Sequence, residues 1–320
     1  MKGEHQQDGI RNNEERPLKY STAEQAGRLN RSYFSRTERL PAFLVLREGQ
    51  DDRHAVSPGG GTAVVGPCFV RGEEWLMRPE IAALYHTWLA SEGGLEADRC
   101  LQRIYHFLRA SAAELLESPD GGWVVVSLLR PEELAVQPSR LAALQDAQLE
   151  ALFAAISERH MKGGDSRLDL LAAYPASGAE FAAQREFIEN VAEQTLGHAF
   201  AAACRIGALI APDAGQAAGE IARIADFLVL DGAADEAAPG ETAAEGFALA
   251  AEEILAAVRR VKPAAVVLAA GPTAAPALAD LYLIGFSGIF CTASQRTEAL
   301  LRAACLTWMA RHESVDSSIS

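Results

Sequence analysis

Three short patterns in this chain bring together residue types that perform chemistry in other proteins. Gly59-Gly60-Gly61 has the glycines of a phosphate-binding loop but lacks the Gly-Lys-Ser/Thr ending that holds the phosphates. The run Gly285-Phe286-Ser287-Gly288 is one residue short of a nucleophile elbow. His86 and His106 have aromatic neighbours on predicted helices, which indicates helix packing rather than metal binding. None of these patterns predicts an activity by itself.

The composition narrows the class of protein. The five cysteines form no CxxC pair and have no zinc-site spacing, which favours a reduced compartment. A net charge of −14 argues against a nucleic-acid partner, because such proteins usually carry a basic surface. The polar N-terminus has no apolar signal region, and no run of about 18 apolar residues predicts a membrane helix. We therefore expect a cytoplasmic protein that binds neither nucleic acid nor membrane.

Short apolar runs alternate with longer Ala-rich amphipathic stretches, which is typical of helices winding a parallel sheet. Six strands are predicted at 123–129, 168–174, 206–210, 227–230, 265–269 and 288–291. The best candidates for two more are 42–47 and 62–70. Helices at a period of 3.6 residues are expected at 78–90, 96–117, 140–159, 178–194, 214–224, 243–261, 274–283 and 294–310. With 320 residues the chain can form one (β/α)₈ barrel, which typically needs about 250, although two domains remain possible.

Two stretches in the last third of the chain carry a family resemblance. The stretch 203–231, ACRIGALIAPDAGQAAGEIARIADFLVLD, has the form strand, turn, helix and strand, and the stretch 266–304 contains a strand, a helix and a strand that ends in Cys291. Both resemble the C-terminal barrel of phosphoenolpyruvate-utilising enzymes of the pyruvate phosphate dikinase type. The resemblance implies a TIM barrel over 18–312 with an insertion at about 41–79, flanked by disordered tails at 1–17 and 313–320.

The family clamps phosphate with arginines, because a planar guanidinium matches phosphate through two hydrogen bonds. Its first arginine follows the second strand in a Gly-Leu-Cys-Arg-Thr-Glu motif, which the run 33–38 resembles, so that Arg36 is the match; an ordinary exposed Arg-Thr-Glu is the alternative. At the second arginine motif, Ser127 stands in the place of the arginine and Arg130 in the place of an aspartate. The resemblance therefore implies that the phosphate clamp is incomplete.

The family also holds Mg²⁺ with a glutamate and an aspartate, since this hard ion prefers oxygen ligands. The glutamate position falls at Ile210, or at Ala211 after a slip of one residue, and the aspartate motif becomes the run 231–234. The ligands of the family's magnesium are thus missing, and we expect neither a metal nor another cofactor. Three acidic residues near the expected carboxyl ends of the strands form either a relocated metal site or solvated loop carboxylates: Asp213, Asp231 and Asp235.

One motif persists at the end of the last predicted strand. The run 290–296, Phe-Cys-Thr-Ala-Ser-Gln-Arg, resembles the family's Ser-Cys-Ser-Pro-x-Arg, which places Cys291 and Arg296 at matching positions. The resemblance implies that Cys291 delivers a proton to an enolate carbon and that Arg296 contacts the substrate. The alternative is that Cys291 packs as a small buried hydrophobic residue.

The resemblance leads to two functional expectations. The first is a catalytically degenerate barrel, a pseudoenzyme that acts as a binding or regulatory protein. The second is an active transferase or lyase that uses Cys291 as proton donor on phosphoenolpyruvate, pyruvate or a related small oxoacid, which would also be the expected ligand. A homodimer is expected in either case, because barrel relatives commonly dimerise and aromatic residues favour interfaces; the candidate residues are Trp75, Trp88 and Trp308.

Overall fold

The computed structural model of the chain describes seven stretches of sequence. They are residues 43–49, 68–91, 93–117, 123–164, 167–197, 204–233 and 241–316. All belong to one compact unit that spans Arg39–Ser320.

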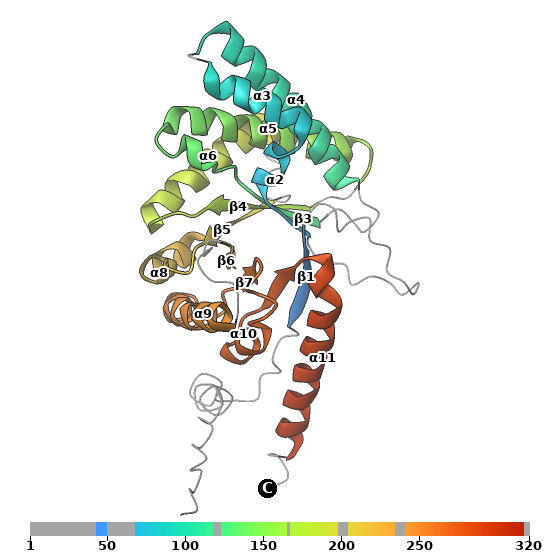
Figure 1. Ribbon diagram of the computed structural model, residues 1–320, viewed down its shortest axis with the longest axis vertical. Coiled ribbons are helices and arrows are strands. Elements are labelled where there is room, and N and C mark those ends of the chain that lie inside the picture. Colours follow the sequence, from blue (N-terminus) through green and yellow to red (C-terminus); the bar gives the residue numbers. More distant parts are fainter. Residues whose placement is uncertain are drawn as a thin grey trace, which may run out of the picture. The chain divides into compact units, whose positions relative to one another are not determined.

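Within these stretches, eight parallel strands form a closed barrel (Figure 1). Each strand pairs with the next one along the chain, and β8 pairs with β1 to close the ring. The strands are β1 (Leu44–Glu48), β2 (Cys68–Val70), β3 (Trp123–Ser127), β4 (Arg167–Ala173), β5 (Cys204–Ile210), β6 (Leu228–Asp231), β7 (Val267–Ala270) and β8 (Gly288–Cys291). The chain therefore has the fold of a (β/α)₈ or TIM barrel, as predicted.

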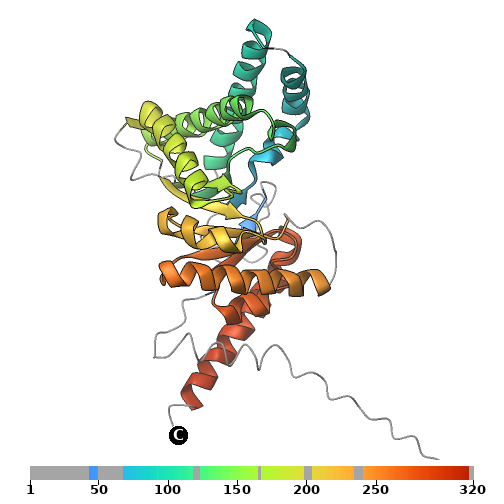
Figure 2. The ribbon, with the colours of Figure 1, turned by 90° about the vertical axis from the view of Figure 1, so that its left-hand side faces the viewer.

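Helices follow the strands and cover the outside of the barrel, as Figure 2 shows from the side. They are α2 (Gly72–Leu76), α3 (Pro79–Ala90), α4 (Leu95–Leu116), the 3₁₀ helix η2 (Glu132–Leu134), α5 (Pro138–Met161), α6 (Gly178–Leu196), α8 (Gly215–Ile224), α9 (Glu241–Val261), α10 (Leu278–Ile284) and α11 (Ala293–Asp316). Among the described helices, none is both long and apolar enough to cross a membrane.

Local sequence signals explain where several helices begin. Pro79 and Pro138 occupy the first turns of α3 and α5, where the missing N–H of proline costs no hydrogen bond. At the start of α6, the Ser177 hydroxyl accepts a hydrogen bond from the Glu180 N–H at 3.1 Å. The Glu180 carboxylate in turn accepts one from the Ala176 N–H at 2.9 Å, which fixes the chain entering the helix.

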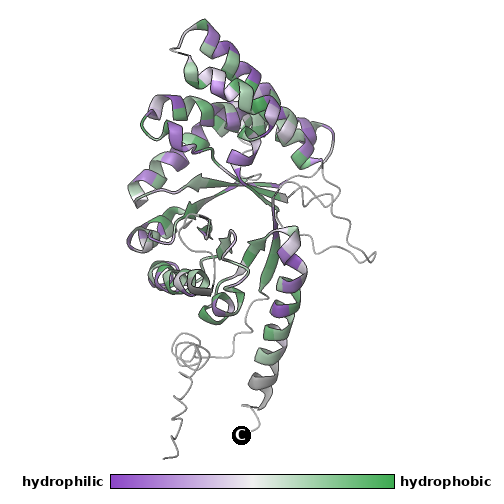
Figure 3. Cartoon of the chain, in the orientation of Figure 1, coloured by the Kyte–Doolittle hydropathy of each residue, from purple (hydrophilic) through white to green (hydrophobic). Residues whose placement is uncertain are grey.

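The apolar side chains form two layers, because successive strand residues point to opposite faces. One cluster fills the barrel interior with alternate strand residues, including Leu46, Phe69, Val229 and Phe290. The other lies between the outer face of the strands and the helices. Figure 3 shows the strands as the most continuously hydrophobic part of the barrel, while polar residues gather on the helices. The same alternation decides which residues at the carboxyl ends of the strands point into the mouth of the barrel.

The segment 41–79, which was expected as an insertion, contains the two strands that were still missing beside the six predicted from the apolar pattern. β1 and β2 lie inside it and pair with each other in parallel, and α2 follows β2 directly. The two strand candidates at 42–47 and 62–70 thus contain barrel strands; of the second, residues 68–70 form β2, and 62–67 lie outside the described residues. The expected tail at 1–17 lies outside the described residues, whereas the expected tail at 313–320 is helical as far as Asp316, the last residue of α11.

Candidate functional site

Charged residues stand at the carboxyl ends of three strands. Glu48 is the last residue of β1, Asp231 is the last residue of β6, and Arg71 directly follows β2. Leu46 and Val229 point into the barrel, so Glu48 and Asp231, two residues further on, point the same way. In TIM-barrel enzymes this carboxyl face is where the catalytic residues lie.

Barrel closure brings these three residues into direct contact. The Arg71 guanidinium donates Nε and Nη2 hydrogen bonds to Glu48 Oε1 at 3.2 and 2.8 Å. It donates a second pair to Asp231, from Nη1 to Oδ2 at 2.5 Å and from Nη2 to Oδ1 at 2.8 Å. These bonds use four of the five N–H groups that a guanidinium carries. Arg71 is therefore clamped between two carboxylates of its own chain.

The two carboxylates are held from behind as well. Glu48 Oε2 accepts the Gly271 N–H at 3.0 Å, and Asp231 Oδ1 accepts the Ala233 N–H at 2.8 Å. Asp231 Oδ2 also accepts a hydrogen bond from the Tyr174 hydroxyl. Gly271 has a φ of +89°, and a Cβ there would lie 2.6 Å from the Ala233 nitrogen, so glycine is required at this position.

We call Glu48, Arg71, Tyr174 and Asp231 the mouth cluster. Glu48 and Asp231 are buried, and the Arg71 side chain is 20% exposed. Burial alone would lower the pKa of Arg71, but the hydrogen bonds and charges of Asp231 and Glu48 raise it above its ordinary value. Burial, the charge of Asp231 and the shared hydrogen bond raise the pKa of the Tyr174 phenol. Tyr174 therefore keeps its proton and acts as a donor.

Two further charged residues surround the mouth cluster. Glu73 Oε1 accepts the Arg130 N–H at 2.8 Å, and burial raises the pKa of the Glu73 carboxyl. The Arg130 guanidinium donates to the carbonyl oxygens of Ala173, at 2.8 Å, and Tyr174. Tyr174 itself has a φ of +46°, a conformation uncommon outside glycine that often occurs at functional sites. With Glu73 and Arg130 included, the mouth contains three carboxyl groups and two guanidinium groups.

The two arginine positions of the predicted phosphate clamp can now be compared with the barrel. Arg36 lies outside the described residues, and it precedes β1 in the chain, whereas the family's arginine follows the second strand. In this barrel the residue that follows β2 is Arg71. Ser127, which stands in the place of the second arginine, is buried, and its hydroxyl accepts the Gly72 N–H at 2.9 Å. Its neighbourhood is closed by protein rather than prepared for an anion.

The positions that the resemblance gives to metal ligands carry no metal site. Ile210 belongs to the apolar layer outside the barrel, and Asp213 is exposed in the turn after β5. Asp231 is engaged in the mouth cluster, and Asp235 lies outside the described residues. Across the stretches that the structure describes, no group of three or more His, Cys, Asp or Glu side chains could hold a metal ion.

Cys291 is the last residue of β8, and Arg296 lies in α11, the helix that follows it. Phe290 fills the barrel interior, so its neighbour Cys291 points to the opposite face and lies buried in the outer apolar layer. The Cys291 thiol donates to the Leu46 carbonyl at 3.5 Å. Arg296 is half-buried in the first turn of α11. The orientation of Cys291 does not support proton delivery to a ligand at the mouth.

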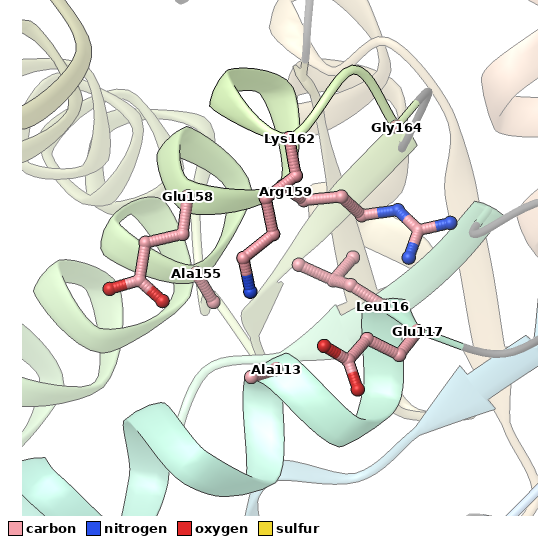
Figure 4. A pocket seen from close by; sticks show the side chains of 8 residues that line it. All are labelled: Ala113, Leu116, Glu117, Ala155, Glu158, Arg159, Lys162 and Gly164. Carbon is pink, nitrogen blue, oxygen red and sulfur yellow. The ribbon is translucent and has the colours of Figure 1, made fainter.

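Two hollows lie away from the mouth, on helices α4 and α5. One, of about 190 Å³, lies where these helices end, and Figure 4 shows Lys162 reaching between Glu158 and Glu117 there. This is the amino-terminal side of the barrel, and the volume is below the roughly 300–1,000 Å³ of typical ligand pockets. The other, of about 470 Å³, is an open groove along both helices with carboxylates that include Asp98 and Asp146. Neither contacts a residue of the mouth cluster.

The mouth cluster went largely unpredicted from the sequence. Only Asp231 was singled out, as one of three acidic residues near the strand ends. A usable signal exists in each case, because a charged residue ends or directly follows a short apolar strand: LVLRE, CFVR and LVLD. In a predicted barrel such residues all meet at the carboxyl face.

Comparisons with known proteins do not assign this chain to a family. The sequence matches no protein-family model and no curated protein. The fold and the contacts at the barrel mouth therefore carry the functional argument.

Proposed function

We propose that this protein is a barrel of the phosphoenolpyruvate-utilising kind that has lost the ancestral chemistry and acts as a binding or regulatory protein. The observation that carries the proposal is that the Arg71 guanidinium is already hydrogen-bonded to the carboxylates of Glu48 and Asp231. A phosphate or carboxylate ligand would have to displace a buried carboxylate to reach this guanidinium.

Electrostatics supports the same conclusion. Conversion of phosphoenolpyruvate creates negative charge on the phosphoryl group and on the enolate, which preorganised cations must stabilise. Here the carboxylates of Glu48 and Asp231 already neutralise Arg71, and an apolar side chain occupies the metal-ligand position at Ile210. Removal of one such stabilising group typically costs on the order of 10²–10³ in rate. Several are missing from this site.

The direct test is incubation of the purified protein with phosphoenolpyruvate and Mg²⁺, with pyruvate release as the readout. We expect no release, and calorimetry should detect no binding of oxalate, pyruvate or phosphoenolpyruvate, with or without Mg²⁺. Turnover by the wild type that disappears in Arg36→Ala or Cys291→Ala would overturn the proposal.

A gain-of-function variant tests whether the two carboxylates keep anions away from Arg71. In Glu48→Gln/Asp231→Asn the two carboxylates become neutral amides, so Arg71 should accept an anion. We expect oxalate binding in this variant and none in the wild type. Asp213→Asn is the matched control, because it removes a carboxylate from the exposed turn after β5 without touching Arg71. Equal oxalate affinity in all three proteins would contradict the assigned role of the carboxylates.

One observation favours a second candidate, an enzyme that transfers protons on a small oxoacid. Glu73 lies beside the mouth cluster, and burial raises its carboxyl pKa toward the range useful for acid and base catalysis. This group, rather than Cys291, would carry the proton. The test is exchange of the pyruvate methyl protons for solvent deuterium, followed by NMR. Exchange in the wild type that Glu73→Gln abolishes would favour this enzyme over the degenerate barrel.

A further inference from the structure

The C-terminal helix α11 carries a continuous apolar surface. Only its first part packs on the barrel, where Ala299 and Ala303 are buried, and the rest extends past the strands in both views (Figures 1 and 2). On the opposite side of the helix, six exposed residues contain no charge: Leu300, Leu301, Ala304, Cys305, Trp308 and Met309. We call these six residues the α11 stripe.

The spacing makes the stripe a single helical face. Its members recur in pairs every four residues, which places them in two adjacent rows along the helix. The four large side chains are 46, 65, 62 and 46% exposed, for Leu300, Leu301, Trp308 and Met309 in turn. An apolar face of this size on a protein surface marks an interaction site.

We propose that the α11 stripe pairs antiparallel with the α11 stripe of a second copy of this chain. The order of side-chain sizes is the same from either end, with large residues at both ends and the small Ala304 and Cys305 in the middle. When two copies meet around a twofold axis, Leu300 and Leu301 of one face Trp308 and Met309 of the other. The small central residues let the two helix backbones approach within normal packing distance.

The area available fits a reversible dimer. A fully buried aromatic side chain covers roughly 150–250 Å², and Leu and Met cover less, so the four exposed fractions amount to on the order of 400 Å² per copy. Two copies thus bring together on the order of 800 Å², while specific interfaces bury about 1,200–2,000 Å² in total. The exposed small residues Ala304 and Cys305 in the middle of the stripe add to this area. We expect a dissociation constant of micromolar order.

The charge of the chain argues against a membrane surface as the binding partner of the α11 stripe. Helices that lie on membranes carry Lys and Arg on the polar face, which anionic lipids attract. The chain has a net charge of −14, and Glu298 and Arg302 next to the stripe form an ion pair that cancels locally. Trp75 and Trp88, the other aromatic residues expected at an interface, are buried in the core. Of the three predicted tryptophans, Trp308 alone can contribute to the contact.

Cys305 provides a direct test, because it lies at the centre of the stripe. It is exposed, whereas Cys68, Cys100 and Cys291 are buried and Cys204 is half-buried. A short bismaleimide should therefore join two copies through Cys305: each thiolate adds to one maleimide double bond, and the neighbouring carbon takes up a proton. We expect a covalent dimer in the wild type and none in Cys305→Ser. Absence of the wild-type crosslink at 100 µM protein would overturn the proposal.

Sedimentation velocity provides the second test with a matched pair of variants. Leu301→Glu places a charge in the stripe, and Leu249→Glu places one on α9 at a residue of similar exposure, 69%. We expect concentration-dependent dimers of the wild type and Leu249→Glu between 1 and 100 µM, and monomers only of Leu301→Glu. Thermal melts confirm that both variants fold. A wild type that stays monomeric, or a Leu301→Glu variant that dimerises equally well, would refute the pairing.

Discussion

At the scale of single residues, Arg71 is the centre of the barrel mouth. Its four hydrogen bonds compensate two buried carboxylates that would otherwise lack a counter-charge. A buried ion pair contributes little net stability against an apolar replacement of the whole group, but removal of one partner leaves an uncompensated charge. The hydrogen bonds of Arg71 thus hold two buried carboxylates of its own chain.

Arg71→Met should therefore destabilise the fold strongly. We expect a loss of about 3–5 kcal/mol in the free energy of unfolding, since Glu48 and Asp231 remain buried without their cation. Urea unfolding followed by circular dichroism measures it. Glu298→Ala is the control, because it removes an exposed ion-pair partner of Arg302 and should cost less than about 0.5 kcal/mol. Similar losses in both variants would show that burial of the mouth cluster is unimportant.

The raised carboxyl pKa of Glu73 predicts a specific pH dependence. The folded state holds this proton more tightly than the unfolded chain, so the neutral form favours folding, and stability is lost as the pH rises above the ordinary glutamate pKa of about 4.3. Glu73→Gln keeps an oxygen for the Arg130 N–H but cannot ionise. We expect the variant to be more stable than the wild type at pH 7, with the difference vanishing below pH about 4. A variant that is less stable at pH 7 would contradict this sign.

At the scale of elements, the apolar runs predicted the strands well, whereas the contacts at the mouth could not be predicted. The strand expected at 288–291 matches β8 residue for residue, and 123–129 begins where β3 begins. Hydrophobic pattern is local, so a single run reveals a strand. By contrast, Arg71 and Asp231 are 160 residues apart, and Glu48 and Gly271 are 223 residues apart. Only closure of the barrel decides that they meet.

The pairing of β1 with β8, which closes the barrel, depends on glycine at position 288. A Cβ there would lie 2.3 Å from the Leu44 carbonyl oxygen, and backbone atoms cannot move aside cheaply. Gly288→Ala should cost about 3 kcal/mol in the free energy of unfolding. Gly246 is the matched control, because it lies within α9 and a Cβ there meets nothing within 4 Å. Gly246→Ala should stabilise the protein by about 0.5–1 kcal/mol. Both are measured by urea unfolding, and equal effects would contradict this account of closure.

At the scale of the whole molecule, ion pairs lie at both ends of the barrel. Asp169 is buried near the start of β4 and accepts two hydrogen bonds from Arg205, at 3.1 and 2.5 Å, at the end opposite to the mouth cluster. Apolar side chains fill the interior between them. Apolar side chains thus fill the barrel, and the charged residues at its two ends pair with one another. Among the described elements, the outer helices, and α11 in particular, offer surface for contacts with other molecules.

The net charge of the chain predicts how salt changes the proposed dimer. Two copies at −14 each repel one another, while the α11 stripe contributes no charge of its own to the contact. Added salt shortens the range of the repulsion, to about 10 Å at 0.1 M ionic strength, and leaves the apolar contact in place. The dissociation constant should therefore fall as NaCl rises from about 20 to 500 mM, a range over which salt bridges at a surface weaken. Sedimentation velocity at three salt concentrations measures the change, with Leu301→Glu as the variant that stays monomeric throughout. Dimers that dissociate as salt is added would instead indicate an ionic interface elsewhere on the barrel, and would remove the α11 stripe as the contact.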